Sequence, residues 1–498
     1  MTFAANQAPD GMHLSGIPVR LPGKIKVLDE AGLEMIHAAS LRVLEETGII
    51  IDHSGMVGQL RASGARADGN RVYLPASLVE MAIASAPAQV TLHARDPKHN
   101  IYLGQGRVHF TNGFGATWVE DPETRQIRDA TLEDLATYTR LADAMDRVDY
   151  CLFSVVPQDI PPALLDVECT AVALANTSKH IQLSLETADW LDEVVRMGEI
   201  VAGPGGPAPF SAGGVPNSPL HYGQATIEKF IRLAQHNIPC FVVCGAMAGA
   251  TAPVTLPGAL VVQNAEVLVG VLVTQLSNPG APVIYGTFTG GFDMRSTKLA
   301  LGGPEVSLIT AASQQLSDRY GIPLGYATGG VSDSNLLDVQ TGIEKTQSVL
   351  FAAAAGVDVV HDAVSGLLGA GMLNNLAGMV IENEEARAIQ YLLGGMPVSE
   401  ALLALEVIAE VGPRGTYLDH MHTAENFRKT LSISPLRKRQ ATKPEEIGGR
   451  STLVENAYRQ ALKVLATHQP LPLLEEQQRQ IAAVRASARE RISKEVHN

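Results

Sequence analysis

Polar side chains gather at the ends of two apolar stretches within residues 322–366. IPLGYAT runs into a glycine pair, and VDVV runs into His361 and Asp362. We read the segment as strand, glycine-rich loop, helix and strand, with Asp333 or Ser334 capping the helix. Apolar strands joined by a crossover helix indicate a parallel sheet. Because catalytic and binding residues of such folds lie at the carboxyl ends of strands, these side chains are candidates for chemistry.

From residue 131 onward, short apolar segments recur, and each is followed by a sequence with helical periodicity. Seven of them are VDYCLFSVV, KHIQLSL, PFSAGGV, IPCFVVCGA, APVIYGTF, IPLGYATG and VDVVHDAV, and a weaker one nearby completes the ring. This rhythm predicts an α/β fold, a (βα)₈ TIM barrel. A doubly wound open sheet is the alternative, but no GxGxxG with a later acidic partner follows the first strand. We expect an N-terminal α+β extension (1–130), the barrel (131–410), and a C-terminal loop and helical extension (411–498).

Composition narrows the class of protein. The net charge of −14 argues against nucleic acid and anionic membranes as partners. The N-terminus lacks the basic and apolar regions of a signal peptide, and no uninterrupted run of about 18 apolar residues occurs, so we predict a cytoplasmic protein. The four cysteines form no CxxC, and HExxH is absent, so we predict neither a disulfide framework nor a metal site.

The predicted strand ends are rich in glycine, aromatic and hydroxyl residues. Aromatic faces with a few carboxylates hold a quaternary or tertiary ammonium group, although plain core packing is the alternative for each ring. Further strand-end residues without an assigned role include Gln158, Asp159, Gln182, Ser184, Asn217, His221, Tyr222, Thr287, Phe288, Asp293, Tyr326 and Asp362. The candidate catalytic residue is His361, for which a satisfied core histidine is the alternative, and the candidate substrate-binding residues are Asn112, Phe114, Thr117, Trp118, Tyr285, Phe292, Thr328, Ser332 and Asp333.

Three long stretches carry a family resemblance. They are GGVSDSNLLDVQTGIEKTQSVLFAAAAGVDVVHDAVSGLLGAGM with the following VIENEEARA, MAGATAPVTLPGALVVQNAEVLVGVLVTQLSNPGAPVIYGT, and GTYLDHMHTAENFRKTLSISPLRKR. From about residue 28 to 470 the chain resembles the trimethylamine methyltransferase family, the corrinoid-linked MttB superfamily. The resemblance implies a TIM barrel that moves a methyl group from an amine to Co(I) of a corrinoid (cobalamin). A separate small protein carries that corrinoid and docks over the barrel mouth, so we expect no tightly bound cofactor in this chain.

The resemblance also bears on the substrate. Founding members carry pyrrolysine in the barrel, whereas this chain has only standard residues. Members without pyrrolysine resemble quaternary-amine enzymes, with glycine betaine as the leading substrate. The alternatives are another methylated amine (proline betaine, carnitine, tri- or dimethylamine) or a barrel that binds methylamines without turnover. We further predict a homo-oligomer, because the C-terminal helices read as exposed.

The chemistry of a quaternary donor agrees with this reading. Its leaving group is a neutral amine, so the protein needs no general base and has only to hold the cation and aim one methyl group. We expect Asp333 and Glu344 to order the glycine-rich loop and the helix after it. The predicted aromatic cage is Phe114, Trp118, Tyr285 and Phe292, and the predicted donors to a betaine carboxylate are His361, Asn112, Thr117 and Thr328.

Overall fold

The computed structural model describes residues 16–19, 23–437 and 453–496. The ends of both predicted extensions therefore lie outside the described residues. The centre of the molecule is a closed ring of eight parallel strands, which confirms the predicted TIM barrel. The strands in chain order are β7 (Arg107–Phe110), β10 (Cys151–Leu152), β11 (Ile181–Gln182), β12 (Phe210–Gly214), β14 (Cys240–Cys244), β16 (Val283–Thr287), β19 (Leu324–Thr328) and β20 (Val359–His361).

The ring closes between its first and last members in two places. β20 pairs in parallel with β7, and a parallel bridge from Thr111 to Tyr150 joins β7 to β10. All seven strands predicted from the sequence are present, and β7 is the eighth. Because β7 lies upstream of residue 131, the predicted boundary separates it from the barrel to which it belongs. Its sequence, RVHF, is followed by further strands rather than by a helix. The alternation of strands and helices in the sequence therefore does not identify β7 as a barrel strand.

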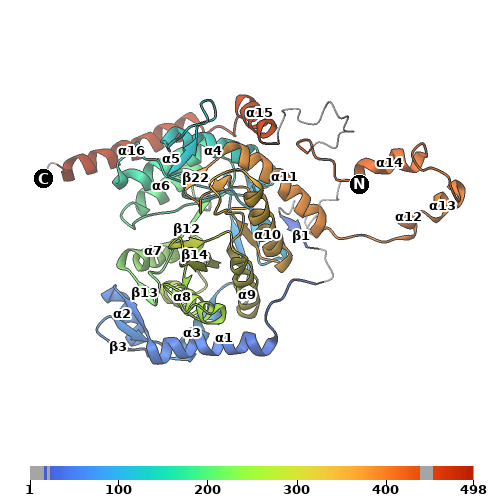
Figure 1. Cartoon of the computed structure of the whole chain (residues 1–498). Coiled ribbons are helices and arrows are strands. Elements are labelled where there is room, and N and C mark those ends of the chain that lie inside the picture. The colour runs from blue at the N-terminus through green and yellow to red at the C-terminus, as the bar shows by residue number, and fades with distance from the viewer. Residues whose placement is uncertain (1–15, 20–22, 438–452, 497–498) are drawn as a thin grey trace.

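The eight helices α4 to α11 surround the strands, and Figure 1 shows them in chain order around the barrel. Among the described helices, α8 alone is long and apolar enough to cross a membrane, yet 72% of its most apolar window is buried inside the protein. It packs against α7, α9, β14 and β16, so its composition reflects burial in the core. The ring consists of α4 (Leu132–Ala144), α5 (Leu165–Asn176), α6 (Leu191–Ala202), α7 (Gln224–Gln235), α8 (Leu256–Ser277), α9 (Pro304–Tyr320), α10 (Val339–Ala355) and α11 (Leu376–Leu393).

The N-terminal segment packs on the outside of the barrel and contributes one hairpin to its interior. α1 (Glu30–Arg42) and α3 (Ala76–Ser85) pack against α8. The hairpin of β5 (Val90–Leu92) and β6 (Ile101–Leu103) contributes four apolar side chains to one buried cluster with residues of the barrel strands. This cluster is the floor of the barrel interior. A small sheet of β2 (Ile49–Ile51), β3 (Arg66–Asp68), β4 (Arg71–Tyr73) and β13 (His221–Tyr222) and the helix α2 (Ser54–Ala62) complete the segment.

Short sheets stand beyond the carboxyl ends of the strands and form the rim of the mouth. One contains β8 (Trp118–Glu120), β9 (Ile127–Asp129), β21 (Leu367–Leu368) and β22 (Leu373–Asn374), and the other contains β15 (Met247–Ala248), β17 (Gly290–Asp293) and β18 (Lys298–Ala300). The predicted helix start at Asp333 or Ser334 is wrong. α10 begins at Val339 with Asp338 as its cap, because the Asp333 carboxylate instead accepts the backbone N–H groups of Leu301 and Gly302.

The C-terminal helices pack on the barrel. α15 (Leu453–Thr467) contacts α11 and α4, and α16 (Glu475–Val496) lies along α5 and α6 (Figure 1). The expectation that α16 is a solvated helix is wrong, because Ile481, Val484 and Ala488 are buried. The buried Glu168 of α5 pairs with Arg485 and Arg489 of α16, which fixes the helix to its own barrel.

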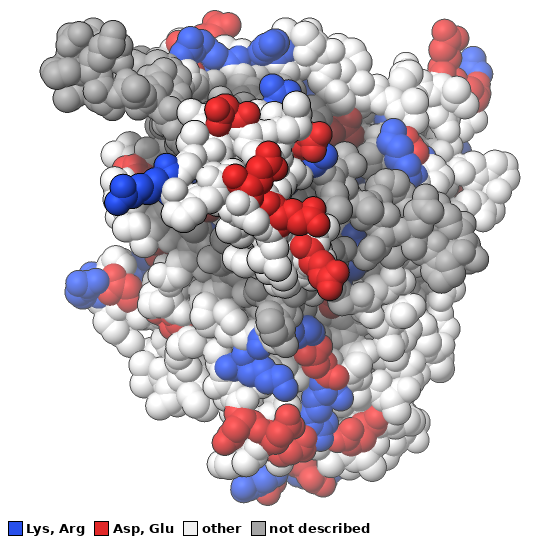
Figure 2. Space-filling view, turned by 90° about the vertical axis from the view of Figure 1, so that its right-hand side faces the viewer, with Lys and Arg blue, Asp and Glu red and all other residues white. Residues whose placement is uncertain are grey.

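A loop of three short helices leaves the end of α11 and returns to it. It contains α12 (Glu400–Leu403), α13 (Leu405–Val411) and α14 (Met421–Thr430), and none of these helices has a buried residue. Tyr391 of α11 donates a hydrogen bond to the Thr430 carbonyl at 2.7 Å. The segment stands away from the barrel in Figure 1, and Figure 2 views the protein from that side, where charges of both signs are scattered among uncharged surface.

The free energy of unfolding should depend on pH because of the buried His180. Its Nδ1 donates to the His93 carbonyl at 2.6 Å, so its Nε2 accepts from Ser211 Oγ at 2.8 Å, and burial lowers its pKa from 6.5 to about 3. The unfolded chain therefore binds this proton more readily, and stability falls as pH drops below 6.5, by about 1.4 kcal/mol per pH unit from this group. Urea unfolding between pH 7.5 and 5 should show a smaller pH slope in His180→Gln, and equal slopes would contradict the assignment.

Candidate functional site

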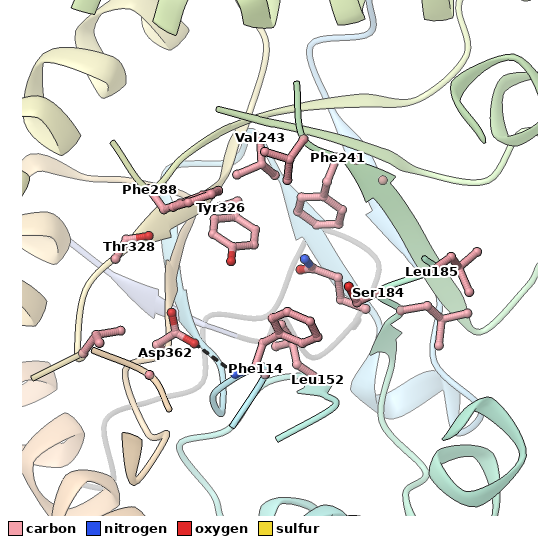
Figure 3. A pocket seen from close by; sticks show the side chains of 18 of the residues that line it. Phe114, Leu152, Ser184, Leu185, Phe241, Val243, Phe288, Tyr326, Thr328 and Asp362 are labelled. Carbon is pink, nitrogen blue, oxygen red and sulfur yellow. Dashed lines mark hydrogen bonds between the residues drawn. The ribbon is translucent and has the colours of Figure 1, made fainter. Parts of the chain in front are cut away.

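A cavity of about 540 Å³ lies at the mouth of the barrel. Every strand, or the loop directly after it, contributes to its wall, so the whole fold is needed to build it (Figure 3). This position at the carboxyl ends of the strands is the usual place of a TIM-barrel active site. One contributor from each is Phe114 after β7, Leu152 of β10, Gln182 of β11, Gly213 of β12, Phe241 of β14, Phe288 after β16, Tyr326 of β19 and Asp362 after β20.

Four aromatic rings face the open space. They belong to Phe114, Phe241, Phe288 and Tyr326, and Figure 3 shows them around one opening. Phe288 and Tyr326 are tilted neighbours with ring centroids 6.5 Å apart. Gly245 makes room for this arrangement, because a Cβ there would overlap the Phe288 ring. Rings that surround a space from several sides attract a cation placed at its centre.

Asp362 adds a carboxylate to the same space. Its backbone is in the left-handed region, with φ of 66°, which is uncommon for a residue other than glycine but tolerated by Asp. The turn directs the side chain into the cavity, where Oδ1 accepts the Phe114 N–H at 3.2 Å. Burial and the Asp362 charge raise the pKa of the Tyr326 hydroxyl well above 10, so that hydroxyl stays protonated.

The candidate catalytic residue His361 does not line the cavity. It is fully buried, and its ring stacks on Tyr326 with centroids 3.6 Å apart and an angle of 20°. Its Nδ1 lies 2.9 Å from Asp362 Oδ2 without the geometry of a hydrogen bond, and neither ring nitrogen has a hydrogen-bond partner among the residues that the structure describes. The structure thus places His361 behind two cavity residues, where it can position Tyr326 and Asp362 but cannot contact a ligand.

Two of the nine candidate substrate-binding residues line the cavity, namely Phe114 and Thr328. Thr328 Oγ1 donates to the Thr287 carbonyl at 3.2 Å. Asn112 instead joins two strand ends, because its amide bonds to both backbone groups of Leu152 at 2.7 and 3.1 Å. These bonds consume the amide and make Asn112 a structural residue.

Tyr285 points away from the cavity. Its hydroxyl donates to Asn264 Oδ1 at 3.1 Å, between the strands and the surrounding helices. The reason is the alternation of side chains along a strand, which sends every second residue outward. The sequence shows no alternation here because both faces of the strand are buried.

The other predicted residues lie outside the cavity lining. Ser332 Oγ donates to Glu344 at 2.6 Å, and Asp333 accepts the Leu301 and Gly302 N–H groups, each at 3.1 Å. Burial raises the pKa of Asp333. The ordering role predicted for Asp333 and Glu344 agrees with these bonds. The remaining three lie on rim segments and are not among the lining residues: Thr117, Trp118 and Phe292.

Several lining residues have no role predicted from the sequence. Strand-end position marked Gln182, Ser184, Phe288, Tyr326 and Asp362, but no residue pattern assigned them a role. Phe241 and Val243 belong to the continuous apolar sequence CFVVC. Because every residue of this strand is apolar, the sequence does not show which positions face inward. Lys229 comes from α7 and lies far from any strand end in the sequence.

The lining carries few charged groups. Among the described residues that line it, Asp362 and Glu186 are the acids and Lys229 is the one base. Lys229 Nζ donates to the Leu185 carbonyl at 2.5 Å. Burial lowers the pKa of Lys229, and the negative charges of Asp166 and Glu186 oppose that shift. The described residues contain no group of three His, Cys, Asp or Glu side chains arranged to hold a metal ion.

Comparisons with known proteins agree with this architecture. Among solved structures, the chain is similar to the monomethylamine methyltransferase of Methanosarcina barkeri, with a TM-score of 0.53, 14% identity, and coverage of 90% of this chain and 89% of that one. At that identity the likeness concerns the fold alone.

Relatives found by sequence are more than twice as identical to this chain as that structure is. A trimethylamine methyltransferase of Desulfitobacterium hafniense is 36% identical over 418 residues, which cover 83% of this chain and 84% of the relative. A glycine betaine methyltransferase of the same species is 31% identical over 425 residues, 84% of each chain. The family model "Trimethylamine methyltransferase (MTTB)" matches residues 4–492. The chain therefore belongs to the trimethylamine methyltransferase (MttB) family.

Proposed function

We propose that this protein transfers a methyl group from a quaternary ammonium compound, with glycine betaine as the first candidate, to the Co(I) corrinoid of a separate protein. The observation that carries the proposal is the cavity in which the rings of Phe114, Phe241, Phe288 and Tyr326 and the carboxylate of Asp362 face one space. Both glycine betaine and trimethylamine enzymes occur among its relatives. The alternatives remain another methylated amine or binding without turnover.

The lining residues suit a donor with a permanent positive charge. The rings attract the cation by their π faces, and the Asp362 carboxylate attracts it by charge. The neutral Tyr326 hydroxyl adds no competing charge. A neutral amine then leaves as the carbon–nitrogen bond breaks, so no side chain has to donate a proton to it. The task of these residues is to hold the ammonium group and direct one methyl group toward the mouth.

The rim of the mouth fits a macromolecular acceptor. The partner's corrinoid supplies the nucleophilic cobalt that accepts the methyl group. Six of the eight loops that follow the strands each expose a large apolar side chain, and exposed apolar surface of this kind marks interaction sites. These side chains are Trp118, Val215, Val254, Met294, Leu336 and Met372. We therefore place the corrinoid protein on this rim.

Charge placed on the rim should weaken the protein partner without affecting the small ligand. The double variant Val254→Glu with Leu336→Glu changes two rim residues that do not line the cavity. We expect the KM for the corrinoid protein to rise roughly 10-fold or more, because buried apolar anchors dominate interface energies. Met35→Glu, on exposed surface of α1, is the matched control. An unchanged KM in the double variant would place the partner elsewhere.

The activity is tested directly with purified protein, a Co(I) corrinoid protein and a panel of amines. The panel contains glycine betaine, proline betaine, carnitine, tetramethylammonium, trimethylamine and dimethylamine, and the formation of methyl-cobalt is followed in the visible spectrum. We expect turnover with quaternary donors and none with dimethylamine. Turnover with trimethylamine alone would favour the second candidate substrate class, and no turnover with any donor would contradict the proposal.

Three expectations remain predictions beside this proposal: the homo-oligomer, the cytoplasmic location and the absence of a tightly bound cofactor in the chain. Sedimentation of the purified full chain tests the first. Cell fractionation tests the second, and the absorption spectrum of the protein purified without its partner tests the third.

A further inference from the structure

A hydrogen bond from Tyr150 orients the amide of Gln182 in the cavity wall. The Tyr150 hydroxyl, fully buried behind it, donates to Gln182 Oε1 at 3.0 Å and is also 3.4 Å from the Gly325 carbonyl. Because burial raises the pKa of Tyr150 well above 10, this hydroxyl stays a donor. The amide oxygen is therefore occupied, and the Nε2 group, which has no partner among the described residues, is left for the cavity that Gln182 lines.

Ser184 follows two residues later on the same wall. It also lines the cavity, and its hydroxyl has no hydrogen-bond partner among the described residues. Figure 3 shows Ser184 and Asp362 on opposite sides of the open space, with the rings of Phe114 and Tyr326 toward it. Around the barrel, β11 is three strands away from β20, which places the two walls face to face. One wall thus offers a carboxylate, and the opposite wall offers uncharged donors.

Lys229 strengthens the polarity of this second wall. Its Nζ is bound to the carbonyl of Leu185, the residue next to Ser184. The charge of Lys229 is partly balanced by Asp166 and by Glu186. It contributes a positive field near Ser184 rather than a direct contact. Glu186 also lines the cavity but is exposed to solvent, which screens its charge.

We infer that Gln182 and Ser184 bind an anionic group of the substrate, a carboxylate, while the rings and Asp362 hold its ammonium end. This inference rests on the proposed function and narrows it to zwitterionic donors. It replaces the donors first predicted for a betaine carboxylate. Asn112, Thr117 and His361 do not line the cavity. Thr328 lines it but donates its hydroxyl hydrogen to the Thr287 carbonyl. A carboxylate accepts two hydrogen bonds side by side, which matches an amide N–H and a hydroxyl on one wall. Tyr150 acts as a positioning residue.

Binding to the purified full chain, without any corrinoid protein, tests the inference. Isothermal titration calorimetry compares glycine betaine with tetramethylammonium, which has the cation but no carboxylate. In Gln182→Leu we expect glycine betaine to bind at least 10-fold more weakly, because a hydrogen bond to a charged group is lost, and tetramethylammonium to change less than 2-fold. Gln182→Glu should weaken glycine betaine further, since two carboxylates then face each other.

Two further variants separate contact from position. Ser184→Ala should weaken glycine betaine selectively, and Tyr150→Phe should do the same without touching the ligand, because the Gln182 amide is then free to turn. Circular dichroism and thermal unfolding establish that each variant is folded. Equal losses for both ligands in Gln182→Leu would overturn the inference.

The inference and the proposed function fail in different ways. Binding of tetramethylammonium but not of glycine betaine by the unsubstituted protein would overturn the carboxylate site and leave the cation site standing. Binding of neither ligand would contradict the proposed function itself.

Discussion

Replacing Asp362 by Asn should reduce methyl transfer from a quaternary donor by roughly 100- to 1,000-fold, because one charge pair at about 4 Å contributes about 4 kcal/mol at an effective dielectric constant of 20. The substitution keeps the size and shape of the side chain. Asn also tolerates the left-handed backbone that Asp362 adopts, and its amide oxygen can still accept the Phe114 N–H. The loss therefore reports chiefly the charge, because the other contact that changes is the one with the buried His361 ring. The measurement is kcat/KM for methyl-cobalt formation, together with the Kd of tetramethylammonium.

Glu186→Gln is the matched control for Asp362. Glu186 is the other acid in the lining, but it is exposed, so solvent screening should limit the effect of its charge on kcat/KM to less than 3-fold. A fold-change for Glu186→Gln as large as that for Asp362→Asn would show that the cavity responds to total charge rather than to a placed carboxylate. An unchanged Kd in Asp362→Asn would remove the role of Asp362.

Replacing Gly330 by Ala should destabilise the protein by about 3 kcal/mol and largely abolish activity. Gly330 has a φ of 76°, and a Cβ there would overlap the Asp362 carbonyl oxygen and lie 2.9 Å from the Ala363 Cα. The left-handed backbone costs about 1–2 kcal/mol for a residue with a Cβ, and the overlap with main-chain atoms adds to it. Relief of the overlap has to move the turn that directs Asp362 into the cavity. Urea unfolding gives the stability, and tetramethylammonium binding gives the state of the site.

Gly342→Ala is the control for this change. Gly342 lies in α10, and a Cβ there would meet nothing within 4 Å. Alanine is the better helix former, so this variant should be equally stable or more stable by up to about 1 kcal/mol, with unchanged binding. If Gly330→Ala behaved like Gly342→Ala, the close approach of the loop to Asp362 would not be essential.

The fold could be predicted from the sequence to a large extent. Seven strands are predictable because each is a short apolar run followed by a sequence with helical periodicity, a pattern that is typical of the TIM barrel. β7 was not recognised as a barrel strand, because it has four residues and leads into the hairpin of β8 and β9 instead of a helix. The sequence of α16 predicts a solvated helix because charged residues outnumber the three buried positions, and two of its arginines pair with the buried Glu168.

The site could be predicted only in outline. Strand ends, glycine and aromatic residues indicated a cation cavity at the mouth, and Phe114 and Thr328 do line it. Tyr285 and Tyr326 show why the individual residues could not be chosen. Each is the third residue of a five-residue strand, VIYGT and LGYAT, yet Tyr285 points to the helices and Tyr326 into the cavity.

The sequence by itself determined the barrel, the family and the position of the cavity, because apolar periodicity and long shared motifs are local properties of the amino-acid sequence. Only the tertiary structure decided which side chains meet there. The register between β16 and β19 shifts at Tyr285 and Gly286, and this stagger sets the face on which each tyrosine lies. In strands that are buried on both faces, the residues of the two faces are equally apolar, so the sequence does not distinguish them. The direction of a side chain then depends on how the strands are staggered around the ring.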